Sequence, residues 1–283
     1  MASAESADLG DLDSLDDRER AAAEALLFRL ADDELVIAER YTEWQVRAPT
    51  LESDIALANI AQDELGHARL WYEVLEHLGH DETDLIWERD PGDFRHSTLA
   101  ELPSSYEEGD WADAIVRSSL YDVAEDVRLS ALESSSLPAI RDRVGKVRSE
   151  ERYHLDHAHN WLERLAASDE GHERVQAAVD RLFPHALTLF EPVGDVEDAI
   201  EDLGLRDRSL DEMREEWLTR VNGTLEGIGI EVPANDVASP VGRDGHHTDD
   251  WHDLHDDMTH TYRELERSTA TRIIDAEETV EDR

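Results

Sequence analysis

Apolar residues recur at alternating steps of three and four along four long stretches of the chain, and this pattern constrains the fold most. In the first stretch, which runs from near Asp17 to before Pro49, the series is Leu27, Leu30, Glu34, Ile37, Tyr41 and Trp44. Such spacing places the side chains on one face of an α-helix, the face that packs inside a helical bundle. Pro49 should end this helix, because the residue before a proline disfavours helical dihedral angles.

Three further stretches carry the same pattern, over residues 50–78, 106–135 and 138–168. Their core-facing series are Leu57, Ile60, Glu64, His67, Trp71, Val74 and Leu78, then Ile115, Ser118, Asp122, Glu125, Leu129 and Leu132, then Ile140, Val144, Val147, Glu151, His154, Ala158, Trp161 and Leu165. Residues 80–106 contain Pro91-Gly92 and are expected to form an irregular connection that crosses the end of the bundle. We therefore expect a four-helix bundle.

Additional helices follow the bundle. A fifth amphipathic stretch covers 175–190, and Pro192-Val193-Gly194 then interrupts the pattern. Shorter helical patterns cover 196–203, 209–228 and 248–271. The chain is thus expected to be all-α, with an acidic flexible tail (1–17), a helical bundle (18–191) and a C-terminal helical extension packed on the bundle (192–283).

Histidines are frequent near the C-terminus, at positions 246, 247, 252, 255 and 260. A His-rich tract can bind metal. Because the stretch from Gly242 to Thr248 is rich in turn formers, we favour a solvent-exposed loop followed by an exposed helix face.

The composition is strongly acidic, with 70 Asp and Glu against 27 Lys and Arg and a net charge of −43. This charge suits either a protein that binds partners through acidic surfaces or a surface adapted to molar salt. The acids run along the entire chain, which favours the salt-adapted surface and a halophilic cytoplasm. A field of this sign also disfavours nucleic acids and anionic membranes as partners.

The chain contains no cysteine, which excludes disulfides, thiolate zinc sites, iron–sulfur ligation and cysteine nucleophiles. Any metal must therefore bind to oxygen and nitrogen ligands. Residues 1–17 carry no basic-plus-apolar export signal, and no apolar run reaches about 18 residues. A soluble, cytoplasmic protein is expected.

Two Glu-x-x-His motifs lie on the predicted seams, at Glu64–His67 and at Glu151–His154. With 14 histidines in an acidic chain, about one or two such motifs are expected by chance. The spacing to a second acid is more specific, since Glu34 precedes Glu64 by 30 residues and Asp122 precedes Glu151 by 29. Each motif helix thus has an inward acid at nearly the same place on its partner helix.

Four carboxylates and two imidazoles in one bundle core require compensation, since an unpaired buried charge costs several kcal/mol. A metal pair provides it when two helices each give one carboxylate and two others each give Glu-x-x-His. The expected ligands are Glu34, Glu64 and His67 around one metal, and Asp122, Glu151 and His154 around the other. Glu64 and Glu151 are the expected bridges, and Glu125 could replace or support Asp122. Hard carboxylates with imidazoles suit a di-iron site, with Mn as an alternative.

A different arrangement satisfies the same pattern without metal. In it, the buried acids pair with inward arginines or histidines, and the matched spacing is the relic of a lost site.

Longer motifs carry a family resemblance over nearly the whole chain after residue 25. They are Arg29-Leu30-Ala31-Asp32, Glu43-Trp44, Ala48-Pro49-Thr50-Leu51-Glu52, Asp54-Ile55-Ala56-Leu57-Ala58-Asn59-Ile60, Glu151-Arg152-Tyr153-His154-Leu155, Trp161-Leu162-Glu163-Arg164-Leu165, and Gly245 with His247-Thr248. Through these motifs the sequence resembles the C subunits of the multicomponent phenylacetyl-CoA 1,2-epoxidase, the PaaC family.

The resemblance implies a ferritin-like subunit that pairs with the catalytic A subunit, in a complex with a flavin and iron–sulfur reductase and one further, small subunit. That complex epoxidises the ring of phenylacetyl-CoA with O₂ and NADPH, and a hetero-oligomer or homodimer is expected. In the family, the A subunit bears the di-iron ligands and many C subunits have lost them. Here Gln62-Asp63-Glu64 and Gly66-His67 match the ligand motif of the A subunit, and the other ligand positions match Glu34, Asp122, Glu151 and His154.

Three functions are consistent with the sequence: an oxygenase subunit with a di-iron site, a scaffold subunit without chemistry, and an independent ferritin-like iron-binding protein. The sequence shows few clustered arginines for the phosphates of CoA, so a partner subunit is expected to hold the CoA.

Overall fold

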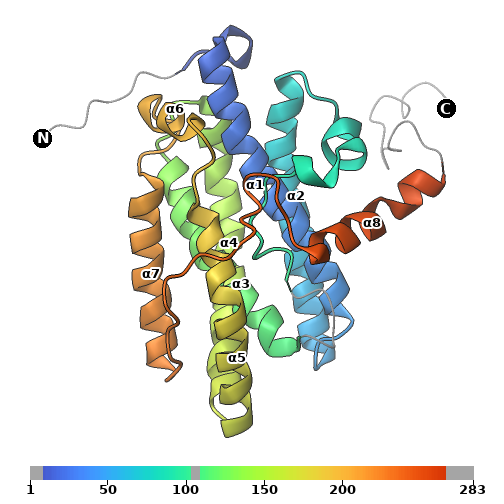
Figure 1. The fold of residues 1–283 in the computed structure, drawn as a ribbon, viewed down its shortest axis with the longest axis vertical. Coiled ribbons are helices and arrows are strands. Elements are labelled where there is room, and N and C mark those ends of the chain that lie inside the picture. The colour runs from blue at the N-terminus through green and yellow to red at the C-terminus, as the bar shows by residue number, and fades with distance from the viewer. Residues whose placement is uncertain (1–8, 103–108, 266–283) are drawn as a thin grey trace, which may run out of the picture.

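A computed structural model describes residues 9–102 and 109–265 (Figure 1). Within these ranges every regular element is helical. Four long helices form the bundle: α1 (Asp17–Gln45), α2 (Leu51–His77), α3 (Trp111–Leu132) and α4 (Pro138–Ala166). Helix α1 packs along α2, α3 packs along α4, and α2 meets α4 across the bundle. The two hairpins thus bring all four predicted seams toward one core.

Local sequence signals position these helices. Asp16 caps α1 in a capping box with Glu19, and Thr50 caps α2 by accepting from the backbone N–H of Ser53. Pro138 stands in the first turn of α4, where its missing N–H leaves no hydrogen bond unmade. The apolar seams predicted for the four helices are buried, except that Trp161 and Leu165 near the end of α4 are only half-buried.

The connection between α2 and α3 is more ordered than expected. It contains a short π-helical turn (Asp84–Glu88) and a 3-10 turn (Pro91–Asp93). Asp32 of α1 accepts hydrogen bonds from the Arg89 side chain and from the Arg95 N–H, and Asp33 accepts one from the Ser97 N–H. Acids of α1 therefore hold this connection against the bundle.

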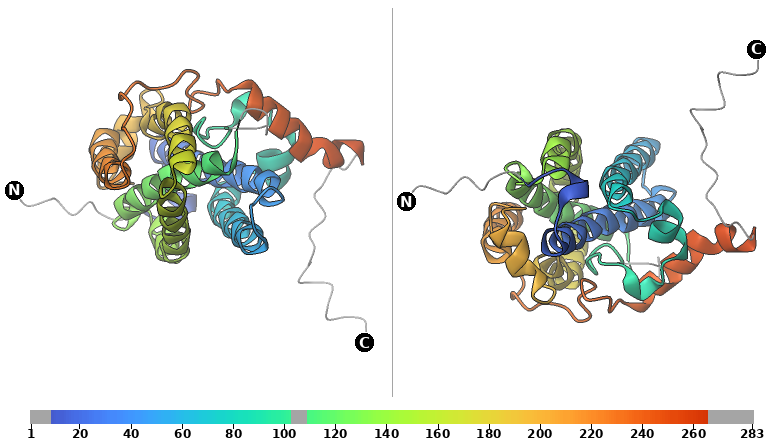
Figure 2. Two further views of the ribbon diagram at one scale, coloured as in Figure 1. Left: turned by 90° about the horizontal axis from the view of Figure 1, so that it is seen from below. Right: turned by 90° about the horizontal axis from the view of Figure 1, so that it is seen from above.

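The C-terminal part adds α5 (Asp169–Ala186), a 3-10 turn (Leu187–Phe190), α6 (Val196–Asp202), α7 (Leu210–Gly227) and α8 (Asp249–Glu264). Helix α5 packs on α3 and α4, α6 on α1, and α7 on α3. In Figure 2, α7 (orange) lies beside the half of the bundle that contains α3, while α8 (red) lies beside α1 and the connection between α2 and α3. One hydrophobic core includes Trp71 of the bundle and Trp217 and Trp251 of the extension. The division at residue 191 stays a proposal, because both sides share this core.

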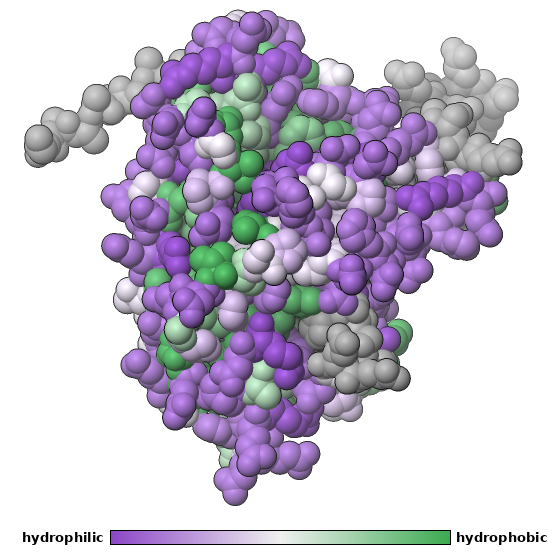
Figure 3. Space-filling view, viewed as in Figure 1, coloured by the Kyte–Doolittle hydropathy of each residue, from purple (hydrophilic) through white to green (hydrophobic). Residues whose placement is uncertain are grey.

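Some expected segments lie outside the described residues, namely the first eight residues of the acidic tail (1–8), the start of the third helix (106–108) and the end of the last helix (266–271). Residues 9–16 of the expected tail include a 3-10 turn, Leu12–Ser14. The face shown in Figure 3 is mostly hydrophilic, with apolar side chains visible between the helices. No described helix has both the length and the hydropathy of a transmembrane span.

Candidate metal centre

Seven acidic and imidazole side chains from the four bundle helices meet in the core, and each is at most 2% exposed. They are Glu34 of α1, Glu64 and His67 of α2, Asp122 and Glu125 of α3, and Glu151 and His154 of α4. The fold therefore brings together all six predicted ligands and the predicted supporting acid.

The two motif glutamates lie at the centre of this group. Nδ1 of His67 is 3.5 Å from Glu64 Oε2 and 3.2 Å from Glu151 Oε1. Nδ1 of His154 is 3.4 Å from Glu64 Oε1 and 3.2 Å from Glu151 Oε1. Each glutamate thus faces both imidazoles, the placement that a bridging ligand needs; the bridging role itself stays a prediction.

Glu34 and Asp122 are the other two predicted ligand acids. Glu34 Oε2 is 3.8 Å from His67 Nδ1, and ligand atoms of Glu34, Glu64, His67 and Glu151 all lie within 4.8 Å of one another. Asp122 is outside that tighter group and has Ser118 Oγ 3.5 Å from its Oδ2. The half of the site around Glu34 is therefore the more compact one.

Many ligand atoms of this group lack hydrogen bonds of acceptable geometry, although they are buried. These are both carboxylate oxygens of Glu34, Glu64 and Glu151, Nδ1 of His67 and His154, Oδ1 of Asp122, and Oε1 of Glu125. Native proteins satisfy nearly all buried polar atoms, so such a concentration needs an explanation. The donor set of carboxylate oxygens and imidazole nitrogens fits two divalent cations.

The outer nitrogen of each imidazole faces a further acid. Nε2 of His67 lies 2.9 Å from Glu150 Oε2, and Nε2 of His154 lies 3.3 Å from Asp63 Oδ2. Each of these acids directly precedes one motif glutamate and contacts the histidine of the other motif. Metal-binding histidines usually donate their second N–H in this way, which orients the first nitrogen toward the metal. The sequence pattern did not predict that Asp63 and Glu150 contact the histidines. The signal that could have indicated it is that each acid lies directly before a motif glutamate.

Crowding of like charges shifts the titration of the acids. Burial and the charges of Glu64 and Glu125 raise the pKa of Glu34 well above its usual range, and burial and Glu151 likewise raise the pKa of Asp122. Burial also raises the pKa of Glu125 to about 7, although Arg128 opposes this shift. Glu34 and Asp122 therefore favour their protonated forms in the metal-free protein.

The imidazoles shift in the opposite sense to ordinary buried histidines. Burial lowers the pKa of His154, but the neighbouring carboxylates of Glu151 and Glu64 outweigh it and raise that pKa to about 12. The pKa of His67 is raised for the same reason. Because metal ligands must be deprotonated, metal binding at this site would displace protons from acids and imidazoles alike.

Comparison with known proteins identifies the family. The family model described as "Phenylacetic acid catabolic protein", which covers PaaA and PaaC, matches residues 9–269. The chain belongs to this family. The C subunit of the 1,2-phenylacetyl-CoA epoxidase of Escherichia coli (strain K12) is 32% identical over 230 residues, which cover 80% of this chain and 90% of the relative. The A subunit of the same enzyme is 28% identical over 198 residues, or 69% of this chain and 63% of the relative.

Among solved structures, a protein from Synechococcus with aldehyde deformylating oxidase activity aligns with a TM-score of 0.57. The alignment has 20% sequence identity and covers 77% of this chain and 95% of that protein. At this identity the similarity concerns the fold alone. The predicted all-α, ferritin-like bundle with additional C-terminal helices is confirmed.

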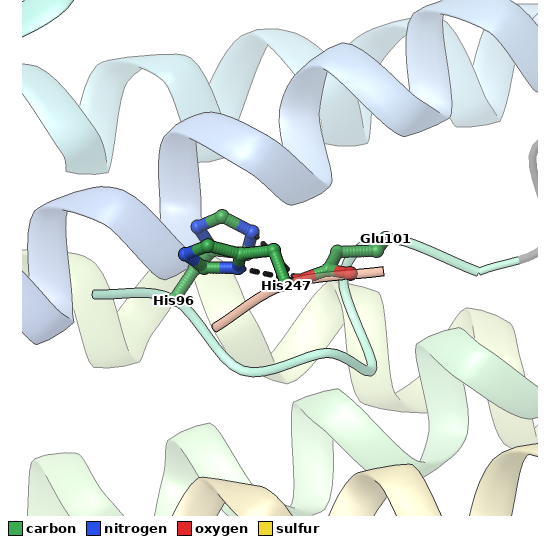
Figure 4. Close-up of side chains that lie close together, drawn as sticks. All are labelled: His96, Glu101 and His247. Carbon is green, nitrogen blue, oxygen red and sulfur yellow. Dashed lines mark hydrogen bonds and ion pairs between the residues drawn. The ribbon is translucent and has the colours of Figure 1, made fainter. Parts of the chain in front are cut away.

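This member of the phenylacetic acid catabolic family has a second buried cluster, which Figure 4 shows. His247 Nδ1 lies 2.7 Å from Glu101 Oε1, and Glu101 Oε2 accepts from the N–H and the hydroxyl of Thr248. His96 Nε2 lies 3.1 Å from Glu101 Oε1, without hydrogen-bond geometry. The two imidazole rings stack with centroids 4.3 Å apart and an angle of 18° between planes.

A metal lies near the plane of each imidazole that binds it, which two nearly parallel stacked rings cannot both satisfy. The cluster is therefore a hydrogen-bonded clasp between the α2–α3 connection and the segment before α8. The expectation that the C-terminal histidines face solvent is wrong for His247 and His255, whose side chains are buried. It was wrong for His247 because turn formers indicate a loop but do not tell which surface the loop covers. It was wrong for His255 because this residue lies on the face of α8 that contacts Phe94.

The fold also gathers arginines that are dispersed in the sequence. Arg29, Arg128, Arg206 and Arg243 line one small pocket of about 30 Å³. Each is buried and paired with an acid, through Glu197 for Arg29 and Arg206 and through Asp33 for Arg128 and Arg243. The sequence shows few clustered arginines, but the fold brings these four together. The guanidinium groups are nevertheless already paired with carboxylates of this chain, so they do not form a ready site for a CoA phosphate.

Proposed function

We propose that this chain is a subunit of a phenylacetyl-CoA 1,2-epoxidase complex and carries its own di-iron site for O₂-dependent epoxidation of the ring. The main support is that many buried carboxylate oxygens and imidazole nitrogens around the matched motifs Glu64–His67 and Glu151–His154 have no hydrogen-bond partner. Membership of the family and the similarity to the C subunit support the complex. The similarity to the A subunit further supports a site in this chain.

The proposed ligand roles are those expected from the spacing of the motifs. Glu34, Glu64 and His67 would hold one iron, and Asp122, Glu151 and His154 the other. Four carboxylates offset two divalent cations, which leaves the imidazoles neutral, as metal ligation requires. Bound iron would supply the activation of O₂. No observation favours manganese.

The chain's own groups would shape that chemistry. Glu150 and Asp63 orient the two imidazoles, and the buried aromatic and aliphatic core around them excludes water. The catalytic A subunit, the reductase and the small subunit of the complex are the proposed partners in a hetero-oligomer. CoA is assigned to a partner, because the arginines that cluster in this chain are buried and paired.

One observation favours the alternative, a structural subunit that stabilises the A subunit. Without metal, His67 and His154 carry protons and lie beside Glu64 and Glu151, so the core compensates part of its own charge. An independent ferritin-like iron-binding role has no such supporting observation.

Anaerobic Fe(II) titration distinguishes the two subunit roles. We expect about two iron ions per chain, and loss of tight binding in Glu64→Gln. Glu197→Gln is the matched control, since Glu197 is also a buried acid but pairs with Arg29 and Arg206, away from the motifs. A folded wild-type chain that binds no iron after reconstitution would contradict the proposal. Unchanged turnover of Glu64→Ala in the reconstituted complex would reduce this chain to a scaffold.

A further inference from the structure

A segment far along the chain reaches the edge of the candidate metal centre. Residues 240–248, here called the strap, lie on the α2–α3 connection. Gly242 and Gly245 have φ of +81° and +85°, and a Cβ on either would lie 2.3 Å from a carbonyl oxygen, of His96 or of Gly92. Backbone contact this close needs glycine at both positions. The clasp of Glu101 with His247 and Thr248 fixes the end of the strap.

Arg243 extends from the strap into the protein and is 1% exposed. Its Nη2 donates to Asp33 Oδ2 at 2.8 Å, and its Nη1 donates to the carbonyl oxygen of Arg95 at 2.8 Å. Asp33 directly precedes the candidate ligand Glu34 on α1. The strap is therefore tied to the helix that carries the first predicted ligand.

Asp33 also accepts from Arg128, and this second contact leads to the site. Nη1 of Arg128 donates to Asp33 Oδ2, the same oxygen that accepts from Arg243, and Nη2 of Arg128 donates to Glu125 Oε2. Glu125 Oε1 is buried without a partner, and the charge of Glu125 raises the pKa of Glu34. Four side chains thus run from the strap to the metal-facing acids.

The charges of Arg243, Asp33, Arg128 and Glu125 are consistent with two divalent cations in the proposed site. Arg128 and Arg243 offset Asp33 and Glu125, so the four acids Glu34, Glu64, Asp122 and Glu151 remain, and these are the charges that two divalent cations offset. Without Arg243, Asp33 would keep the Ser97 N–H and only one of its two arginine partners, Arg128. Arg128 would then be drawn toward Asp33, and its hold on Glu125 would weaken.

We propose that Arg243 is a positioning residue of the metal centre: by sharing Asp33 with Arg128, it lets Arg128 hold Glu125 away from the metals. The inference rests on the proposed di-iron site. If the inference is correct, Asp122 is the metal ligand from α3. Glu125, one helical turn away, is then held by Arg128 and does not bind the metal.

The test uses full-length protein loaded with Co(II), whose visible d–d bands weaken as the coordination number rises. In Arg243→Met, the released Glu125 should add an oxygen ligand, so the bands should weaken while metal is still bound. Arg243→Lys, which keeps the charge, should recover part of the intensity. In Arg243→Met combined with Glu125→Gln, the released side chain is neutral and the wild-type bands should return.

Arg206→Met is the matched control, because Arg206 is 4% exposed and lines the same pocket, but it pairs with Glu197 and Glu201. It should leave the bands unchanged even where stability falls. Wild-type bands in Arg243→Met, equal weakening in Arg206→Met, or no recovery in the double variant would each overturn the inference. If Arg243→Met does not fold, the same comparison is made with Arg243→Lys alone and with Glu125→Gln added. A wild-type chain that binds neither Co(II) nor Fe(II) would instead overturn the proposed function, and the inference with it.

Discussion

Three consecutive acids on α1, Asp32, Asp33 and Glu34, are all fully buried but differ in their hydrogen bonding. Asp32 accepts from the Tyr72 hydroxyl at 2.6 Å and from the Arg89 side chain, and Asp33 accepts from two arginines. Neither oxygen of Glu34 has a hydrogen-bond partner. Asp32 and Asp33 therefore stabilise the fold through hydrogen bonds, while both oxygens of Glu34 remain available to bind a metal.

This contrast predicts opposite effects of neutralising neighbouring acids. In the metal-free protein, Asp32→Asn should lower the free energy of unfolding by about 3 to 5 kcal/mol, since it leaves the Arg89 charge buried and unpaired. Glu34→Gln should leave stability unchanged or raise it, because it removes a buried carboxyl group in a crowded acid cluster. Denaturant unfolding at constant salt measures both. A large loss in Glu34→Gln would contradict the assignment of Glu34 as a free ligand.

The raised pKa values predict that the stability of the metal-free protein falls as pH rises, and that bound metal reverses this trend. The pKa of His154 rises from 6.5 to about 12 on folding and that of Glu125 from 4.5 to about 7. A raised pKa contributes stability that is complete below the unfolded value and is lost as pH rises through the folded value. Metal-free protein should thus lose stability from about pH 5 upward because of Glu125, and further above pH 6.5 because of His154. Metal-loaded protein should gain stability over pH 5 to 7, where binding displaces protons. Thermal unfolding of both forms between pH 5 and 9 tests this, and parallel curves would contradict it.

At the scale of elements, helices and their buried faces were predictable because apolar periodicity records which side of a helix packs. Thr50 and Pro138 marked the helix starts for equally local reasons. The candidate site was also predictable, from the similar distances in sequence between Glu34 and Glu64 and between Asp122 and Glu151. The strap, the clasp and the docking of the α2–α3 connection could not be predicted, because contacts between loops distant in sequence leave no periodic trace. His247 illustrates this, since only the fold shows that Glu101 is its partner.

The clasp should set the local stability of the strap. Replacing Glu101 with Gln removes the charge that His247 and the Thr248 hydroxyl contact, so a loss of about 1 to 3 kcal/mol is expected. Hydrogen exchange should accelerate in residues 92–98 and 242–248 while the centre of α4 stays protected. His246→Ala is the matched control, because the adjacent His246 side chain is 79% exposed. Equal exchange in both variants would show that the clasp does not hold the strap.

At the scale of the whole molecule, the chain has a net charge of −43. Most acids of the described residues are exposed or half-buried, whereas the buried acids of the bundle are paired or belong to the candidate site. Screening acts on exposed charges far more than on buried pairs such as Arg29 with Glu197. The salt-adapted surface therefore remains a prediction about repulsion between exposed carboxylates.

Stability should accordingly rise as salt is added. Between about 0.1 M and 1 M ionic strength the Debye length falls from about 10 Å to about 3 Å, which removes most repulsion between exposed acids. We expect the free energy of unfolding in urea to increase steeply over this range of KCl. Stability that is independent of KCl would contradict a surface adapted to high salt.

Asp33 and Arg243 are 210 positions apart in the chain. A ribosome adding about 5 to 20 residues per second needs roughly 10 to 40 seconds to travel from one to the other. In the later part of that interval, once α4 has been completed at Ala166, all four helices that bear the proposed ligands exist, but Arg243 has not yet been made. Iron captured by the nascent chain would meet a Glu125 that Arg128 holds less firmly. Correct loading is therefore expected only after the strap has been made and has docked.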